Sequence, residues 1–160
     1  MKRRASRDVF VDNHVGRKGV PTRRSFETWV GVALGNRARG RHQINIALYA
    51  PREARAINRR FRARDYATNV LSFPYEPLPH ERTGLLGDLL ICPAVVAREA
   101  AEQGKPLRDH FAHLTIHGVL HLLGHDHETD ADATRMEALE VRILACLGIA
   151  NPYETPDRKR

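Results

Sequence analysis

Cysteine is scarce in this sequence, aromatic residues are few, and long apolar runs are missing. The two cysteines, Cys92 and Cys146, lie far apart and belong to no CxxC pattern, so we expect small buried residues and no disulfide framework. No apolar run is long enough to cross a bilayer, and the basic first residues precede no apolar segment typical of a signal peptide. These absences predict a globular, cytoplasmic protein without a membrane segment.

Acidic residues are rare in the first part of the chain. Residues 1–64 contain 17 Lys and Arg against 4 Asp and Glu, whereas residues 65–160 contain 9 against 15, and the net charge is +7. A basic surface of this kind can bind a polyanion such as nucleic acid, with an affinity that falls as salt rises. It also fits a protein whose charge only keeps it in solution, so composition favours nucleic acid weakly.

Hydrophobic periodicity predicts four strands and five helices in the order β-α-β-α-β-β-α-α-α. We expect strands near residues 9–11, 42–50, 69–73 and 87–92. We expect helices near residues 23–37, 51–61, 93–103, 106–123 and 130–147, with Ala54, Ile57 and Phe61 inward on the second and Asp130 or Asp132 capping the last.

These elements predict an α+β fold, with a small mixed four-stranded sheet packed against about five helices. The first two strand–helix–strand crossovers allow parallel pairing, and the loop over 74–86 allows the third and fourth strands to pair antiparallel. The helix over 106–123 is apolar nearly all round, so it should be buried at the centre. We expect one domain over 1–160, with loose tails at 1–8 and 151–160.

Three histidines near the end of that helix form the strongest functional signal. His117 and His121 are four residues apart, so both point to one side of the helix and can bind one metal ion. Gly124 lets the chain leave the helix, and the short turn brings His127 back to the same ion. Three protein ligands leave a fourth position open for water, which is typical of catalytic zinc sites.

Two further histidines compete for this role. His113 lies one helical turn before His117, and His125 lies two residues before His127. We expect both to stay outside the direct ligand set, in supporting or solvent-facing positions. A lone histidine on an apolar helix is more often a core residue, but three at ligand spacing favour a metal site.

The spacing of the three histidines matches that of metzincin peptidases. Those enzymes carry a glutamate directly after the first histidine as general base, and this chain has Gly118 there. A peptidase would need another carboxylate, of which Asp126 and Glu128 are nearest in sequence. A zinc metallopeptidase-like hydrolase is therefore an alternative only. A non-catalytic RNA-binding protein with a structural zinc is another, and it would need a fourth protein ligand such as His125 or Asp126.

The run HGVLHLLGHDH at 117–127 resembles the signature of the YbeY family of metal-dependent endoribonucleases. Two further blocks agree with it, namely NRRFR at 58–62 followed by TNVLSFP at 68–74, and Gly87-Asp88 at the start of the next strand. The blocks follow the family's order and span residues 58–127. The chain departs from the pattern at Asn69, where aspartate is frequent, and at His125, where tyrosine is common.

The resemblance implies a specific activity and site. It implies one zinc ion per chain held by His117, His121 and His127, and Arg62 as a functional residue of the cleft. It implies a hydrolase that cleaves single-stranded RNA, acts on the 3′ end of small-subunit ribosomal RNA and in ribosome quality control, and has the small ribosomal subunit as partner. Zinc can lower the pKa of its water to about 7, and Arg62 can hold a phosphate by two hydrogen bonds.

Overall fold

The computed structural model describes residues 8–38 and 40–154. Its strands are β1 (Val9–Asn13), β2 (Gln43–Leu48), β3 (Val70–Pro74) and β4 (Leu85–Ile91). Its helices are α1 (Arg23–Leu34), α2 (Pro51–Arg62), α3 (Pro93–Gln103), α4 (Leu107–Leu122) and α5 (Asp130–Cys146). The predicted order of elements is confirmed, and their bounds differ from the predicted ones by a few residues. No helix in the described parts of the chain is both long and apolar enough to cross a membrane.

The four strands form one mixed sheet in the order β1-β2-β4-β3. β1 and β2 are parallel, β2 and β4 are parallel, and β3 runs antiparallel to β4. The predicted antiparallel pair is therefore confirmed, and β4 separates β2 from β3. As a result β3 is an edge strand, and alternate residues along it face opposite sides of the sheet.

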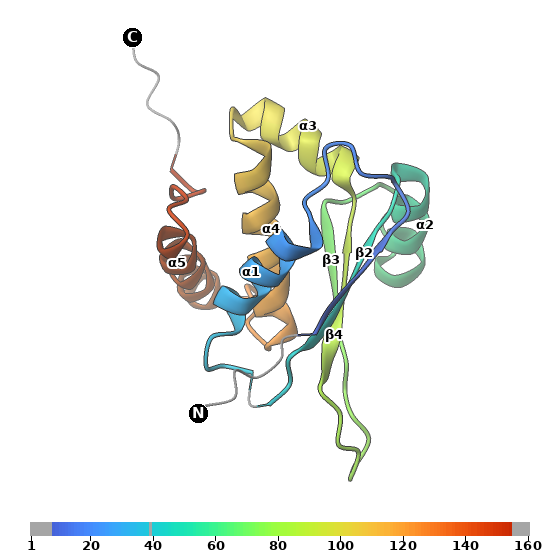
Figure 1. Ribbon diagram of the computed structural model, residues 1–160, viewed down its shortest axis with the longest axis vertical. Helices are drawn as coiled ribbons and strands as arrows, with labels where there is room; N and C mark the ends of the chain where they lie inside the picture. The colour runs from blue at the N-terminus through green and yellow to red at the C-terminus, as the bar shows by residue number, and fades with distance from the viewer. Residues whose placement is uncertain (1–7, 39, 155–160) are drawn as a thin grey trace.

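Helices cover both faces of the sheet (Figure 1), with α1 and α4 on one side and α2 on the other. The larger core lies between the sheet, α1, α4 and α5, and a smaller one lies under α2. Helix α4 is buried as predicted, because most of its residues, including Phe111, Ile116 and Leu120, are inaccessible. The α+β prediction with a buried central helix is thus confirmed.

Local sequence accounts for where several helices begin. The Thr22 side chain accepts a hydrogen bond from the Ser25 amide and caps α1, and Pro51 occupies the first turn of α2. Helix α5 is capped by Thr129, whose Oγ1 accepts from the Asp132 amide. Our expectation of Asp130 or Asp132 as the cap was wrong. Both lie inside the first turn, where their negative charges interact favourably with the positive end of the helix dipole.

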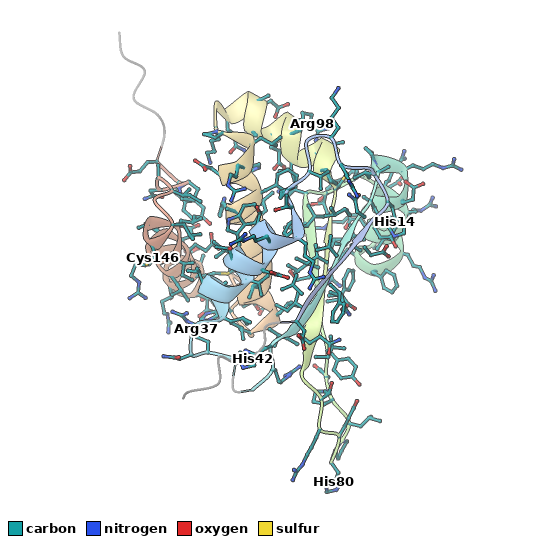
Figure 2. All side chains as sticks on the ribbon, in the orientation of Figure 1. His14, Arg37, His42, His80, Arg98 and Cys146 are labelled. Atoms are coloured by element: carbon teal, nitrogen blue, oxygen red, sulfur yellow. The ribbon has the colours of Figure 1, made fainter. Side chains whose placement is uncertain are left out.

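Three further expectations need correction. Cys92 is buried, but Cys146 lies exposed on α5 (Figure 2). Phe61 was expected to point inward, yet it is 55% exposed. The tail expected to be loose over 151–160 is held at its start, since the Pro152 carbonyl accepts a hydrogen bond from Lys105 at 2.7 Å. Residues 1–7 and 155–160 of the two expected tails lie outside the described residues.

Candidate metal centre

The three predicted histidines converge at the end of α4. His117 and His121 extend from the last two turns, and their Nε2 atoms lie 3.0 Å apart. The His127 ring centroid is 4.8 Å from that of His121 and 5.7 Å from that of His117. One ligand atom from each ring lies within 4.8 Å of the others, so the three imidazoles could hold one metal ion.

The turn that returns His127 to the helix follows from Gly124. This residue has a φ of 94°, in the region that favours glycine. Its amide donates to the His121 carbonyl at 3.0 Å, and the His125 amide donates to the Leu120 carbonyl at 3.0 Å. The sharp exit from the helix is thereby fixed by backbone bonds, and it places His127 beside the other two rings.

Gly118, which stands where a metzincin has its glutamate, lies against the sheet. A Cβ atom at this position would lie 2.8 Å from Leu89 Cδ2 and 3.4 Å from Ser72 Oγ. Leu89 is buried, so its side chain has little freedom to move aside. A glutamate at position 118 would therefore overpack this contact, and the chain has no carboxylate there to act as a peptidase's general base.

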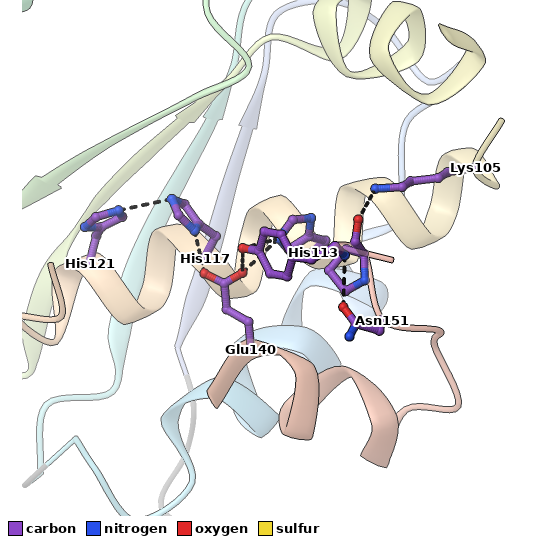
Figure 3. A network of polar contacts seen from close by, with 8 residues as sticks. Lys105, His113, His117, His121, Glu140 and Asn151 are labelled. Carbon is purple, nitrogen blue, oxygen red and sulfur yellow. Dashed lines mark hydrogen bonds and ion pairs between the residues drawn. The ribbon is translucent and has the colours of Figure 1, made fainter. Parts of the chain in front are cut away.

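A buried carboxylate forms a hydrogen bond with the first histidine of the site, on the ring nitrogen opposite His121 (Figure 3). Glu140 of α5 is fully inaccessible, and its Oε1 lies 2.6 Å from His117 Nδ1. Its Oε2 accepts hydrogen bonds from His113 Nε2 at 2.8 Å and from the Tyr153 hydroxyl at a short distance. Burial alone would raise the pKa of Glu140, but hydrogen bonds from His113, His117 and Tyr153 hold it at about 2.

The ionised Glu140 determines which nitrogen of His117 is free. A carboxylate can only accept, so Nδ1 of His117 carries the proton and Nε2 keeps its lone pair toward His121. His121 also favours its neutral form, because burial, then the neighbouring His117 and His127, lower its pKa. Neutral imidazoles with a carboxylate behind one of them are the donor set and support that zinc sites use, so these residues fit a zinc ion.

A second group in the same network could also hold a metal ion. His113, His117 and Glu140 bring ligand atoms within 4.8 Å of one another. These atoms already form hydrogen bonds with one another, and the Tyr153 hydroxyl also donates to the Glu140 carboxylate. The rings of His117, His121 and His127 line a cleft, so an ion held between them would be reachable by a substrate.

The cleft beside the histidines has a volume of about 650 Å³ and is also lined by Arg62 and Ser72. The Arg62 guanidinium donates to the Ser72 carbonyl at 2.9 Å, and the Ser72 hydroxyl donates to the Gly118 carbonyl at 3.3 Å. The structure therefore brings Arg62 into one cleft with the three histidines. The guanidinium also donates to the Phe61 carbonyl at 3.5 Å, and its other N–H groups can bind a ligand.

Other residues singled out from the sequence lie around this site. His125 and Asp126 line the cleft but do not belong to the converging group. Asn69 donates from its side-chain amide to Glu99, at 3.1 and 3.2 Å to the two carboxylate oxygens. An aspartate at position 69 would place a second carboxylate against Glu99. The asparagine found here donates to Glu99 instead, which accounts locally for the departure from the family pattern.

Two residues of the network were not found from the sequence. Glu140 follows Met136 by one helical turn and so lies on the buried stripe of α5, where a charged residue is unusual. A charged residue on this apolar stripe was the sequence signal that could have identified Glu140. Tyr153 lies in the segment expected to be loose and carried no signal, because its partner is 13 residues away on another element.

Comparisons with known proteins identify the family of this chain. The family model described as endoribonuclease YbeY matches residues 12–148. A protein of Stenotrophomonas maltophilia named endoribonuclease YbeY is 53% identical over 150 residues, which cover 91% of this chain and 92% of the relative. One of Chromohalobacter salexigens with the same name is 50% identical over 135 residues, covering 84% and 88%.

A solved structure supports the fold independently. The solution structure of TM1509 from Thermotoga maritima has a TM-score of 0.54 to this chain, covers 95% of it and 99% of the neighbour, and is 23% identical in sequence. At that identity the likeness concerns the fold alone. The family match and the two relatives extend over most of the chain, and the blocks that suggested the family lie within the matched range. The chain belongs to the endoribonuclease YbeY family.

Proposed function

We propose that this protein is a zinc-dependent endoribonuclease that cuts single-stranded RNA at the cleft between α4 and β3. The observation that carries the proposal is the convergence of His117, His121 and His127 beside Arg62 in one open cleft. Membership of an endoribonuclease family supports RNA as the substrate. A bound zinc ion would polarise a phosphoryl oxygen and make a water molecule a stronger acid.

The chain's own residues would position the substrate. Arg62 presents a planar guanidinium that can hold a phosphate by two hydrogen bonds, and its bond to the Ser72 carbonyl fixes its direction. Glu140 keeps the proton of His117 on Nδ1, and the buried packing of α4 holds His117 and His121 in place. The basic residues of the first part of the chain would attract the negatively charged strand.

We further propose that the cellular substrate is the 3′ end of small-subunit ribosomal RNA. In this proposal the protein acts in the cytoplasm, on the small ribosomal subunit, in rRNA maturation and ribosome quality control. Support comes from the family resemblance and from the basic character of residues 1–64. Incubation with precursor small subunits should shorten the rRNA at its 3′ end, and unchanged 3′ ends alongside cleavage of free RNA would contradict this assignment.

The test of the activity is cleavage of an end-labelled single-stranded RNA by purified wild type, His121→Ala and His125→Ala. His125 is a matched control, because it lines the same cleft without joining the converging group. We expect wild type and His125→Ala to cleave, and His121→Ala to lose both zinc and cleavage while keeping its fold. Equal cleavage by all three proteins would contradict the proposal.

Product ends then separate two chemical routes. A 2′,3′-cyclic phosphate would indicate attack by the RNA's own 2′-hydroxyl, and a linear phosphate with no cyclic precursor would indicate attack by water. The same RNA annealed to its complement should resist cleavage. Cleavage of peptides by the wild type is not expected, since Gly118 stands where metzincins have the glutamate that acts as general base.

A further inference from the structure

Exposed aromatic side chains gather at the end of α2, on the opposite side of the sheet from α4. Phe61 is 55% exposed and Tyr66 is 51% exposed, which is unusual for such large rings. They lie within a basic stretch that includes Arg59, Arg60, Arg62 and Arg64, all of them exposed. Arginine interleaved with accessible aromatic rings is the composition of surfaces that bind single-stranded nucleic acid.

Phe61 and Phe73 form a pair of rings, here called the phenylalanine pair. Their centroids are 5.6 Å apart in an edge-to-face arrangement with an interplanar angle of 73°. The guanidinium carbon of Arg60 lies 5.3 Å from the centroid of the Phe61 ring, and that of Arg62 lies 5.1 Å from the centroid of Phe73. Each ring therefore has a cation over it and, at Phe61, a large accessible surface.

Arg62 connects this pair to the cleft. Its guanidinium lines the cleft beside the histidines and also lies over Phe73. Ser72 and Phe73 are neighbours on the edge strand β3, so one faces the cleft and the other faces α2. A strand whose phosphate is held at Arg62 therefore has an adjacent nucleotide next to the phenylalanine pair.

We propose that the phenylalanine pair binds one unpaired base of the RNA, next to the phosphate held at Arg62. This inference rests on the proposed function, because it assigns a subsite to the same substrate. The base stacks on the accessible ring of Phe61, and Arg60, which is exposed, is free to turn from the ring to a neighbouring phosphate. Duplex RNA cannot present an unstacked base in this way, so the subsite selects single strands.

The phenylalanine pair is part of a longer apolar groove. This groove, of about 700 Å³, also contains Phe10, and it passes two acidic residues, Asp12 and Asp88. Asp88 is the cross-strand neighbour of Phe73, and its Oδ1 accepts a hydrogen bond from the Asn45 side-chain amide at 2.8 Å. Arg60 and Arg62 lie over the rings of Phe61 and Phe73, so cations accompany both rings of the pair. An apolar protein segment would use the whole groove, including Phe10, which is as exposed as Phe61 at 56%.

The test measures binding separately from cleavage. The probe is a fluorescent single-stranded 2′-O-methyl oligonucleotide, shown by gel to stay intact, titrated with metal-loaded wild type, Phe61→Leu and Phe10→Leu. Loss of one base–aromatic stack should weaken binding of Phe61→Leu about tenfold. Phe10→Leu is the matched control and should bind as wild type does, with both variants unfolding at the wild-type temperature.

Two further arms identify the contact as stacking. An abasic site moved along the oligonucleotide should, at one position, weaken binding to wild type but not to Phe61→Leu. The Phe61→Trp variant should keep wild-type affinity, and its added indole should lose fluorescence on binding RNA. The single natural tryptophan, Trp29, is buried and supplies a constant background.

Three results would overturn the subsite. These are unchanged affinity of Phe61→Leu, abasic penalties that are the same in wild type and Phe61→Leu at every position, and equal losses for Phe61→Leu and Phe10→Leu, which would indicate an apolar docking groove. Failure of the proposed function looks different: RNA would bind with the expected Phe61 dependence but would not be cut. Cleavage without any effect of Phe61 on binding would leave the proposed function intact and remove this subsite alone.

Discussion

Two of the histidine–glutamate pairs on helix α4 look alike locally but lie in different surroundings. Near its start, His110 Nε2 lies 2.8 Å from Glu99 of α3, and His110 is only 4% exposed. Near its end, His117 Nδ1 lies 2.6 Å from the fully buried Glu140 of α5. Both glutamates occupy neighbouring helices, and both pairs are held within the packed protein.

The difference lies in the second nitrogen of each ring. His117 directs Nε2 toward His121 and the cleft, where His127 also arrives. Among the described residues His110 Nδ1 is buried without a hydrogen-bond partner, and no group of three ligands includes His110. A histidine–carboxylate pair alone therefore does not distinguish the proposed metal centre, and the convergence of ring nitrogens from three histidines does. Substitutions at the start and at the end of α4 should therefore affect different properties of the protein.

The largest expected difference comes from removing the charge of each glutamate. Glu140→Gln should weaken zinc binding by about 10- to 100-fold, because carboxylates that orient ligand histidines contribute that much to affinity. Glu99→Gln should leave zinc affinity unchanged, since its partner His110 does not join the converging group. Competition with a chromophoric chelator measures both variants, and equal affinities would remove the distinction between the two pairs.

A second substitution disturbs only the packing at the end of α4 that carries His117 and His121. Gly118→Val adds a branched side chain where even a Cβ would lie 2.8 Å from the buried Leu89. We expect the free energy of unfolding to fall by about 2 kcal/mol, as for other overpacked cores. Urea unfolding measures the loss. Substitution at Gly104, where a Cβ would meet no atom within 4 Å and only the positive φ of 63° opposes it, is the control for backbone strain without overpacking.

A third change addresses the residue that shares the cleft with the histidines. Arg62→Lys keeps a positive charge but loses the two-pronged hydrogen bond, so kcat/KM for RNA should fall roughly tenfold while zinc content stays the same. Arg64→Lys is the matched control, because Arg64 is exposed on the same basic stretch but does not line the cleft. Near-normal cleavage by Arg62→Lys would remove Arg62 from the proposed site.

The smallest effect concerns pH and the pair at the start of α4. Burial lowers the pKa of His110 below its ordinary value of 6.5, against the opposing effect of Glu99. The unfolded chain then takes up a proton at a higher pH than the folded protein does, so the stability contribution of neutral His110 is lost as pH falls below about 6.5. His110→Gln cannot be protonated and should lose less stability than wild type between pH 7.5 and 5.5.

Urea unfolding of both proteins at the two pH values measures this difference, and zinc is held constant throughout. A larger loss in His110→Gln than in wild type would show that His110 is preferentially protonated in the folded state. RNA cleavage by His110→Gln at neutral pH should match that of wild type, in contrast to changes at the other end of α4.

Local sequence was sufficient to predict the elements and the three converging histidines. The spacing of His117 and His121 on one helix and the exit at Gly124 are short-range features, so sequence determines them directly. The antiparallel pairing of β3 and β4 followed from one loop. The position of β4 between β2 and β3 did not follow, because strand alternation defines which face a residue occupies but not which strand lies beside it.

Long-range partners account for what sequence reasoning missed. Glu140 reaches His117 across 23 positions, and Tyr153 reaches Glu140 from beyond the end of α5. The exposure of Phe61 was also missed, since helical periodicity placed it in line with Ala54 and Ile57. Tertiary packing decided each of these, because Glu140 and Tyr153 meet residues of other elements, whereas Phe61 lies against the Phe73 ring in an open groove.

The most direct test of the account is a crystal structure of the zinc-loaded protein with anomalous scattering at the zinc edge. We predict one zinc ion per chain, bound by His117, His121 and His127 at about 2.0–2.1 Å, with a non-protein ligand in the remaining position and Glu140 still bonded to His117. Zinc held by His113, His117 and Glu140, or enclosed by four protein ligands that include His125 or Asp126, would contradict the proposed catalytic centre.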